Sequence, residues 1–352
     1  MRVLVVEDSL TVRRRLCEVL EADPGIEIIG EAEDGRQAID LCTKRRPDVI
    51  TMDMMLPVMT GLAATEYIMA HCPTPILICS ASTNRGELFK TYDALAAGAV
   101  EVLEKPRGDE IDGSWERRFV ETLKLVARIP VITHPRARLG ALGVPRSLPP
   151  VTPHREVGAP PSCRLVAIGA STGGPGALVD ILRALPKEFR LPLLLVLHIN
   201  EPFGTAFADW LDGQSSRRVA YAVDGELLSS TAGRVVMAPP DRHLVVDNGR
   251  LRLTRDPERN SCRPSVDVLF ESLARECGGS VTACLLTGMG RDGAAGLLAI
   301  RRAGGFTIAQ DEATSVVYGM PQEAARLGAA MRVLPLGDIA GFLKYLPGEV
   351  SK

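Results

Sequence analysis

The chain has 352 residues, 46% of them hydrophobic, and a formal net charge of −2 at pH 7. This length is enough for about two domains of roughly 150 residues each, and the small net charge creates no field that would gather nucleic acid or an anionic membrane. No apolar run approaches the ~20 residues of a membrane span, and the first apolar stretch is too short for a signal peptide. The eight cysteines contain no Cys-x-x-Cys pair, so we expect reduced thiols in a cytoplasmic protein.

Residues 1–127 alternate short apolar runs with longer amphipathic ones, which indicates βαβ units around a parallel sheet. The predicted strands are 2–6, 26–30, 48–53, 76–80 and 99–104. The predicted helices are about 9–22, 35–45, 61–71, 86–97 and 114–127. Five strands and five helices in this order predict a flavodoxin-like doubly wound domain.

The composition changes after residue 127. Residues 128–162 contain eight prolines and show no sustained periodicity, so we predict a linker there. Residues 163–346 are predicted to form a second, mostly parallel, doubly wound α/β domain, followed by a tail at 347–352. Its predicted strands are 164–169, 192–197, 218–223, 234–238, 243–247, 251–254, 281–286, 306–309 and 331–334. The Asn-Gly pair at 248–249 accepts positive φ, which predicts an antiparallel hairpin on an otherwise parallel sheet.

Chemically active side chains stand at the ends of four predicted strands of the first domain. Glu7 and Asp8 follow the first strand, Asp53 ends the third, Ser80 the fourth, and Lys105 follows the fifth. Three carboxylates without Cys or His make a hard oxygen site suited to Mg²⁺. A lysine and a hydroxyl opposite them suit the oxygens of a phosphoryl group. Any one of the acids is equally well explained as a solvated loop residue, but five such groups at successive strand ends favour a site.

The segments around these residues resemble the receiver domain of two-component response regulators. The matching segments are 5–9, 51–61, 78–81 and 104–106, and the resemblance spans 1–127. It implies that a histidine kinase phosphorylates Asp53 and that Asp8 and Asp53 hold Mg²⁺. Glu7 stands where many receivers carry Asp and remains a plausible further ligand. The resemblance also implies a cis peptide bond between Lys105 and Pro106.

A serine, a histidine and an aspartate each follow a different apolar run of the second domain. Ser171 follows 165–170, His198 follows 191–197, and Asp292 comes shortly after 281–286. If these runs are neighbouring parallel strands, the three residues meet at the strands' carboxyl ends, where open α/β sheets bind ligands. A hydroxyl, an imidazole and a carboxylate in one crevice are the parts of a nucleophilic hydrolase.

The local sequence around the serine supports that interpretation. Residues 169–173 fit Gly-x-Ser-x-Gly, which places a nucleophile on a tight strand-to-helix turn. The helix expected near Pro175 would direct unpaired N–H groups toward an oxyanion. The alternative, a dinucleotide site, needs Gly-x-Gly-x-x-Gly, and Ser171 replaces its second glycine. His243, which opens a predicted strand, remains a competitor to His198. Asp292 precedes a glycine and is otherwise explained as a turn residue.

Segments from 164 to about 340 resemble the chemotaxis response-regulator methylesterases, which are protein-glutamate methylesterases of bacterial chemosensory pathways. The matching segments are 167–175, 203–208, 263–270, 286–296 and 308–321. The resemblance implies that Ser171, His198 and Asp292 are catalytic. The backbone N–H groups of Thr172 and Met289 are our candidates for the oxyanion hole.

Both resemblances together imply a phosphorylation-controlled serine hydrolase that demethylates glutamate methyl esters on chemoreceptors, with glutamine deamidation as a second activity. They imply Mg²⁺ at the receiver and no cofactor for ester hydrolysis. The expected partners are methylated chemoreceptors and a chemotaxis-type histidine kinase, with no nucleic acid and no direct membrane insertion.

The expected mode of control is that the unphosphorylated receiver covers the site near Ser171. Details of the carboxyl-terminal third resemble the surface-sensing branch of the family more than the flagellar one.

Two rival interpretations remain from other classes of protein. A non-catalytic phospho-switch would bind a partner through the second domain, and an intact triad argues against it. A DNA-binding regulator would need a basic helix-turn-helix, which the sequence after residue 163 does not contain.

Overall fold

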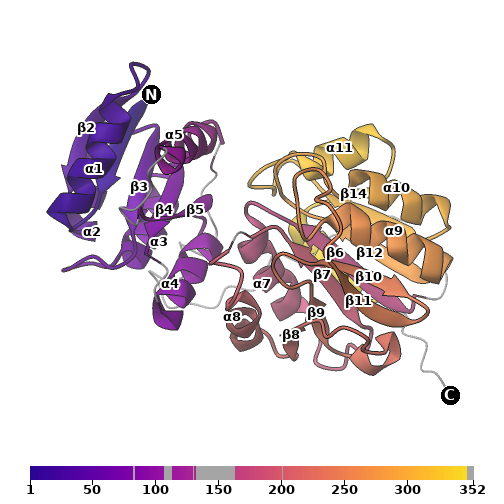
Figure 1. Ribbon diagram of the computed structural model, residues 1–352. Coiled ribbons are helices and arrows are strands. Elements are labelled where there is room, and N and C mark those ends of the chain that lie inside the picture. Colours follow the sequence, from indigo (N-terminus) through magenta and orange to yellow (C-terminus); the bar gives the residue numbers. More distant parts are fainter. Residues whose placement is uncertain (82–83, 107–112, 130, 132–162, 200, 347–352) are drawn as a thin grey trace. The chain divides into compact units, whose positions relative to one another are not determined.

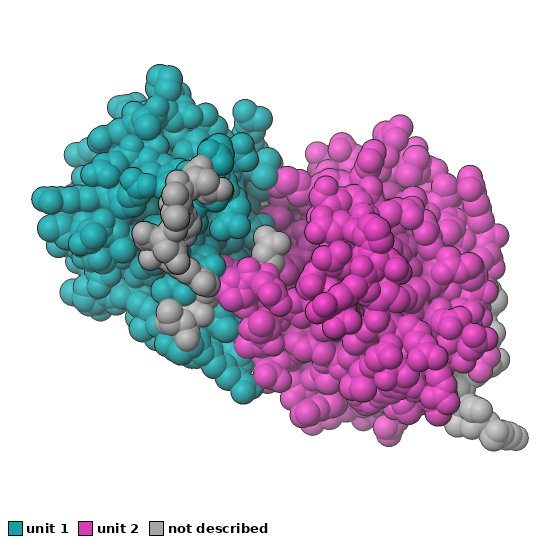
Figure 2. Space-filling view, in the orientation of Figure 1, with its two compact units in different colours: residues 1–147 teal, residues 148–352 magenta. Residues whose placement is uncertain are grey.

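The computed structural model describes residues 1–352 except 82–83, 107–112, 130, 132–162, 200 and 347–352 (Figure 1). The chain divides into two compact units, Met1–Ser147 and Leu148–Lys352 (Figure 2). The division falls inside the predicted linker, most of which lies outside the described residues, as does the tail at 347–352. The domain limits predicted from the sequence therefore stay predictions. Among the described residues, no helix has the length and apolar character needed to cross a membrane.

The first unit is a five-stranded parallel sheet with strand order β2-β1-β3-β4-β5. Its strands are β1 (Arg2–Val6), β2 (Glu27–Ala32), β3 (Val49–Asp53), β4 (Ile76–Ser80) and β5 (Glu101–Glu104). Its helices are α1 (Leu10–Glu21), α2 (Gly35–Arg45), α3 (Gly61–His71), α4 (Arg85–Ala96) and α5 (Ser114–Val126). This is the flavodoxin-like order, so the predicted fold is confirmed. Because β1 lies between β2 and β3, the chain adds β2 on one side of β1 and then β3, β4 and β5 on the other side, so the strand order reverses at β1.

Side-chain caps and one glycine fix the loops at the carboxyl edge of this sheet. Asp34 caps α2 by accepting hydrogen bonds from the backbone N–H groups of Arg36 and Gln37. Thr60 caps α3 in the same way. A Cβ on Gly61 would lie 1.9 Å from the carbonyl oxygen of Asp53, so only glycine lets α3 begin this close to the end of β3.

The second unit contains a seven-stranded sheet that is parallel throughout, in the order β14-β13-β12-β6-β7-β9-β8. Its strands are β6 (Leu165–Ala170), β7 (Leu193–Leu197), β8 (Val219–Tyr221), β9 (Val235–Met237), β12 (Val281–Leu285), β13 (Phe306–Gln310) and β14 (Arg332–Leu334). Its α-helices are α7 (Gly174–Ala184), α8 (Phe207–Gln214), α9 (Val266–Cys277), α10 (Ala294–Arg302), α11 (Met320–Arg326) and α12 (Leu336–Lys344). Short 3₁₀ turns occur at Leu228–Thr231 and Gly278–Ser280. Each predicted strand range overlaps an observed strand.

The predicted hairpin is present, but it is not part of the large sheet. Strands β10 (His243–Asp247) and β11 (Arg250–Thr254) pair antiparallel as a separate two-stranded sheet. Asn248 and Gly249 between them have φ values of 49° and 68°, as a two-residue primed turn requires. The turn chemistry predicts the hairpin but carries no information about which sheet edge it joins.

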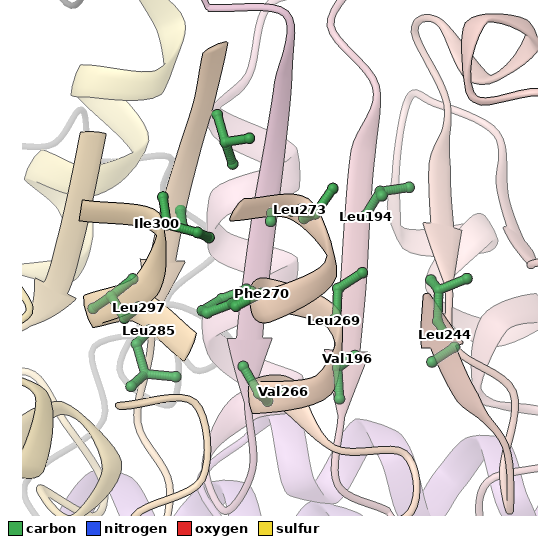
Figure 3. Packing of buried hydrophobic residues seen from close by; sticks show 14 of the residues in the cluster. Leu194, Val196, Leu244, Val266, Leu269, Phe270, Leu273, Leu285, Leu297 and Ile300 are labelled. Atoms are coloured by element: carbon green, nitrogen blue, oxygen red, sulfur yellow. The ribbon is translucent and has the colours of Figure 1, made fainter. Parts of the chain in front are cut away.

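Helix α9 packs one apolar face against the large sheet, and this contact forms much of the buried core of the unit (Figure 3). Val266, Leu269, Phe270 and Leu273 recur at helical spacing and are all 0% exposed. They pack in one cluster with side chains of β7 and β12 and with Leu297 and Ile300 of α10. Each such side chain contributes about 1.5–3 kcal/mol when buried, so this face holds α9 firmly in place on the sheet.

We predict that a side chain at Gly296 will destabilise the second unit, because α9 and α10 lie very close together at this residue. A Cβ there would lie 2.7 Å from Cβ of Phe270 and 3.0 Å from Cα of Asp267. Gly296→Ala should therefore lower the free energy of unfolding of this unit by about 1–3 kcal/mol. The matched control is Gly341→Ala in α12, where a Cβ meets no atom within 4 Å and should stabilise by about 0.5–1 kcal/mol. Urea unfolding measures both, and an unchanged midpoint for Gly296→Ala would contradict the packing.

Candidate functional sites

The predicted triad residues follow three adjacent strands of the second unit. Leu285 of β12 pairs with Gly169 of β6, and Ala170 of β6 pairs with Leu197 of β7. Ser171 and His198 are the next residues along their strands, and Asp292 lies in the loop after β12. Strand β6 lies where the chain order across the sheet reverses, which is where open α/β sheets bind ligands.

Asp292 and His198 are directly hydrogen-bonded. His198 Nε2 lies 2.8 Å from Asp292 Oδ2, and the Asp292 carboxylate is almost completely buried. The same carboxylate accepts hydrogen bonds from the backbone N–H of Val266 at 2.6 Å, Ser265 Oγ at 2.7 Å and Asn260 Nδ2 at 3.1 Å. The N-cap residue and the first residue of α9 thus supply two of these donors, and the helix dipole favours the negative charge.

These contacts keep Asp292 ionised and His198 basic. Burial acts to raise the pKa of Asp292, but His198 and the hydrogen bonds from Ser265 and Asn260 together outweigh it and lower the pKa. Burial acts to lower the pKa of His198, but the hydrogen bonds and charges of Asp292 and Cys262 together outweigh it and raise the pKa to about 9. Because the carboxylate faces Nε2, the neutral ring carries its proton on Nε2 and a lone pair on Nδ1.

The Nδ1 atom of His198 faces a thiol in this structure. Cys262 Sγ lies 3.7 Å from His198 Nδ1. Ser171 stands at the adjacent strand end, yet in the described part of the chain no hydrogen bond joins its side chain to His198. The structure therefore joins His198 to Asp292 and places Ser171 at the adjacent strand end, without a hydrogen bond to the ring. Nδ1 is the ring nitrogen that does not face Asp292, the reverse of the arrangement in chymotrypsin.

Ser171 lies in a turn that glycines allow to pack tightly against neighbouring loops. Gly173 has φ of 78°, and a Cβ on it would lie 2.5 Å from Cβ of Val316. A Cβ on Gly288 would lie 2.8 Å from Cβ of Ser171, and the Ser171 N–H donates to the Thr287 carbonyl at 3.0 Å. The loop after β12 therefore runs directly past Ser171.

The two oxyanion-hole candidates lie on either side of this contact. Met289 follows Gly288 and Thr172 follows Ser171. Among the described residues, none accepts a hydrogen bond from the backbone N–H of Met289. That donor is therefore available to a ligand beside Ser171.

His243, the alternative to His198 in the sequence analysis, lies elsewhere, and its contacts support the fold. It is completely buried. Its Nδ1 accepts from the backbone N–H of Ser265 at 3.2 Å, and its Nε2 faces the Pro257 carbonyl at 3.2 Å. Both ring nitrogens are therefore engaged by backbone groups, and His243 supports the residue that caps α9.

Sequence reasoning did not assign roles to Asn260, Cys262, Ser265 and Asp267. Ser265 caps α9 and also donates to Asp292. Asp267 accepts from Asn260 Nδ2 at 2.9 Å and from the Gly296 N–H at 2.7 Å, and burial raises its pKa. A serine just before an apolar helical repeat is a helix-start signal, so the cap was detectable. The contacts of Asn260 and Cys262 had no sequence signal.

The first unit gathers its predicted residues at the ends of β1, β3, β4 and β5. One carboxylate oxygen from each of Glu7, Asp8 and Asp53 lies within 4.8 Å of the others. Lys105 Nζ lies 2.8 Å from Glu7 Oε2 and 3.0 Å from Asp53 Oδ1. Ser80 is buried on β4, next in register to the strand end that carries Lys105. The predicted acids and lysine are therefore one cluster, and Ser80 ends the strand beside the one that leads to Lys105.

Burial sets the electrostatics of this cluster. It raises the pKa of Glu7, although Lys105 opposes the shift. Burial acts to lower the pKa of Lys105, but the charges of Asp53 and Glu7 outweigh it and raise the pKa. Three hard oxygen donors this close together fit Mg²⁺, whose preferred ligands are carboxylate oxygens and water.

The expected cis bond between Lys105 and Pro106 is wrong for this structure. The cis peptide bonds among the described residues are Glu201–Pro202 and Arg263–Pro264. An X-Pro bond prefers trans by roughly 0.5–1 kcal/mol, so the surrounding fold decides each case and a family pattern alone does not.

Comparisons with known proteins agree with this geometry. The fold and the two sites define a response regulator whose output unit is a hydrolase-like α/β domain. The CheB methylesterase family model matches residues 166–343, and the response regulator receiver domain matches residues 3–112. The chain belongs to the CheB methylesterase family.

The relatives match over nearly the whole chain. A protein-glutamate methylesterase/protein-glutamine glutaminase of Nitrosospira multiformis is 43% identical over 99% of this chain and 98% of its own length. A protein of the same name from Anaeromyxobacter dehalogenans is 42% identical over 98% of this chain and 97% of its own length.

A solved structure matches the second unit. The catalytic domain of Thermotoga maritima CheB methylesterase is 38% identical with a TM-score of 0.50, and the match covers 53% of this chain and all of that one.

We expect His198 to titrate well above an ordinary histidine. Its pKa of about 9 exceeds the ordinary histidine value of about 6.5, so the stabilisation by its charged form is complete below about pH 6.5 and is lost as pH rises through about 9. The imidazole resonances in NMR should show the raised pKa, and Asp292→Asn should lower it because the carboxylate charge is removed. Titration of His198 at or below 6.5 in the unaltered chain would contradict the observed pairing.

Proposed function

We propose that this chain is a phosphorylation-regulated protein-glutamate methylesterase that acts on chemoreceptors. The observation that carries the proposal is the hydrogen-bonded pair of His198 and the buried Asp292, at the strand end next to Ser171 and at the reversal point of the parallel sheet. The names of full-length relatives support the substrate. Methylated receptor helices are accordingly the proposed substrate, and the cytoplasm is the proposed location.

Ester hydrolysis follows from the three side chains. Ser171 Oγ attacks the γ-carbonyl carbon of a methylated glutamate, and its proton passes to Nδ1 of a deprotonated His198 ring, the form that a pKa of about 9 leaves as the minority at pH 7. Asp292 holds the ring in the Nε2–H tautomer and stabilises the imidazolium. The Met289 and Thr172 N–H groups are proposed to bind the oxyanion. The proton on Nδ1 then goes to the leaving methanol, and water releases the glutamyl group by the same path.

A primary carboxamide can react in the same way. Attack of Ser171 on the γ-carbonyl of glutamine would expel ammonia in place of methanol. The relatives are named for both activities, and this supports glutamine deamidation as a second activity of the same site.

The first unit supplies the control in this proposal. Asp53 would accept a phosphoryl group from a chemotaxis-type histidine kinase, with Ser80 and Lys105 holding phosphoryl oxygens. Glu7, Asp8 and Asp53 would hold Mg²⁺, which neutralises phosphoryl charge during transfer. The observed Lys105 contacts to Glu7 and Asp53 support this assignment because they place the cation at the acceptor carboxylate.

Substitutions in the proposed triad test the chemistry. Ser171→Ala and His198→Ala should each lower kcat for methanol release from methylated receptor by about 10⁴-fold or more, because triad members act as a unit. His243→Gln is the control, since an amide can replace the ring's two backbone hydrogen bonds. It should retain activity within about tenfold of wild type. An active Ser171→Ala variant would refute the nucleophile, and an unaltered chain without turnover would favour the non-catalytic phospho-switch.

Phosphorylation should raise the esterase rate of the full chain. A small-molecule phosphodonor with Mg²⁺ is expected to increase methanol release, and Asp53→Asn should abolish the increase while leaving basal turnover. The isolated 163–352 fragment should be faster than the unphosphorylated full chain if the receiver inhibits. A folded fragment that is no faster would show that phosphorylation acts by another route, such as recruitment to the receptor.

A further inference from the structure

Two cysteines of the first unit lie close enough for their thiols to interact. Cys42 lies in the last turn of α2, and Cys72 immediately follows α3. Their sulfur atoms are 3.7 Å apart, although 30 residues separate them in sequence. Both are free thiols, with Cys42 buried and Cys72 partly exposed. Helices α2 and α3 pack side by side, so the pair bridges two neighbouring helices.

The surroundings give the two thiols different chemistry. The hydrogen bond from Cys42 lowers the pKa of Cys72 to about 6, with further lowering by Thr43 and by the charge of Arg46. The same hydrogen bond, together with burial, raises the pKa of Cys42. Burial also raises the pKa of Cys79 and Cys284. The lowered pKa of Cys72 favours its thiolate form, and a partly exposed thiolate is the form that reacts with oxidants.

We propose that Cys42 and Cys72 are a redox modification site at which a hydroperoxide forms an intramolecular disulfide. The Cys72 thiolate attacks the terminal peroxide oxygen, the O–O bond breaks, and the alkoxide leaves (hydroxide when the oxidant is hydrogen peroxide), giving a sulfenic acid. The Cys42 thiol then attacks that sulfur, the S–O bond breaks, and water leaves with the Cys42 proton. The two sulfurs are oxidised by two electrons in total and the peroxide is reduced by two.

The position of the pair predicts what the disulfide does. Helices that follow parallel strands run back along the sheet, so the carboxyl ends of α2 and α3 lie at the edge opposite Asp53. The crosslink closes a loop of about 30 residues, which restricts the unfolded chain. The modification therefore stabilises the receiver and leaves its acceptor carboxylate accessible to a phosphodonor.

The test uses the full chain treated with hydrogen peroxide and analysed by intact mass and peptide mapping. We expect loss of two hydrogen atoms, a Cys42–Cys72 peptide, a higher unfolding midpoint for the receiver, and reversal by dithiothreitol. Cys42→Ala should stop at a sulfenic acid on Cys72 that a 1,3-diketone probe traps. Cys277→Ala, which removes another partly exposed cysteine, should leave disulfide formation unchanged.

A kinetic measurement tests the thiolate independently of the disulfide. At pH 6, Cys72 should be alkylated by iodoacetamide about tenfold faster than Cys277, because its larger thiolate fraction outweighs its lower intrinsic nucleophilicity. Cys42→Ala should reduce this advantage because the donor is lost. Peroxide treatment that leaves both thiols reduced, or that links Cys72 to a second chain or to another cysteine, would overturn the proposal.

Discussion

The catalytic unit depends on one buried negative charge, the carboxylate of Asp292. An ion removed from water costs several kcal/mol unless it is paired and hydrogen-bonded. Here the compensation comes from the α9 amino terminus, from the segment before it, and from His198. Removing any one donor leaves part of that charge uncompensated, so the geometry of the site and the stability of the unit are linked through this carboxylate.

The same interaction connects core packing to the site. Val266 buries its side chain against the sheet while its backbone N–H donates to Asp292. A Cβ on Gly169 or on Gly293 would lie within 2.7 Å of a methyl carbon of Val266. These glycines therefore let β6 and the Asp292 loop reach the first turn of α9. The apolar face of α9 thus determines where the carboxylate stands, and the carboxylate determines which nitrogen of His198 carries a proton.

Much of this arrangement was predictable from the sequence, and the reason is topological. Apolar runs predict strands, and polar residues just after parallel strands must meet at one edge of a sheet. Glu7, Asp53, Ser171, His198 and Asp292 were found in that way. Asn260 and Cys262 reach the site from an irregular loop before α9, where no periodicity applies. The hairpin was predicted by its turn, but its separation from the large sheet depends on tertiary packing. The expected Lys105–Pro106 cis bond was wrong because isomer choice depends on the surrounding fold.

Both units place an acid at the point where their strand order reverses, but the counter-charges differ. In the receiver, the ammonium of Lys105 lies against two buried carboxylates, Glu7 and Asp53. In the catalytic unit, one carboxylate faces an imidazole that can gain or lose a proton. A lysine keeps its charge through the physiological range, so its site suits a bound anion such as a phosphoryl group. The His198 ring, whose pKa is raised to about 9, still loses its proton more readily than a lysine ammonium, so its site suits proton transfer, and the difference follows from the cation opposite each acid.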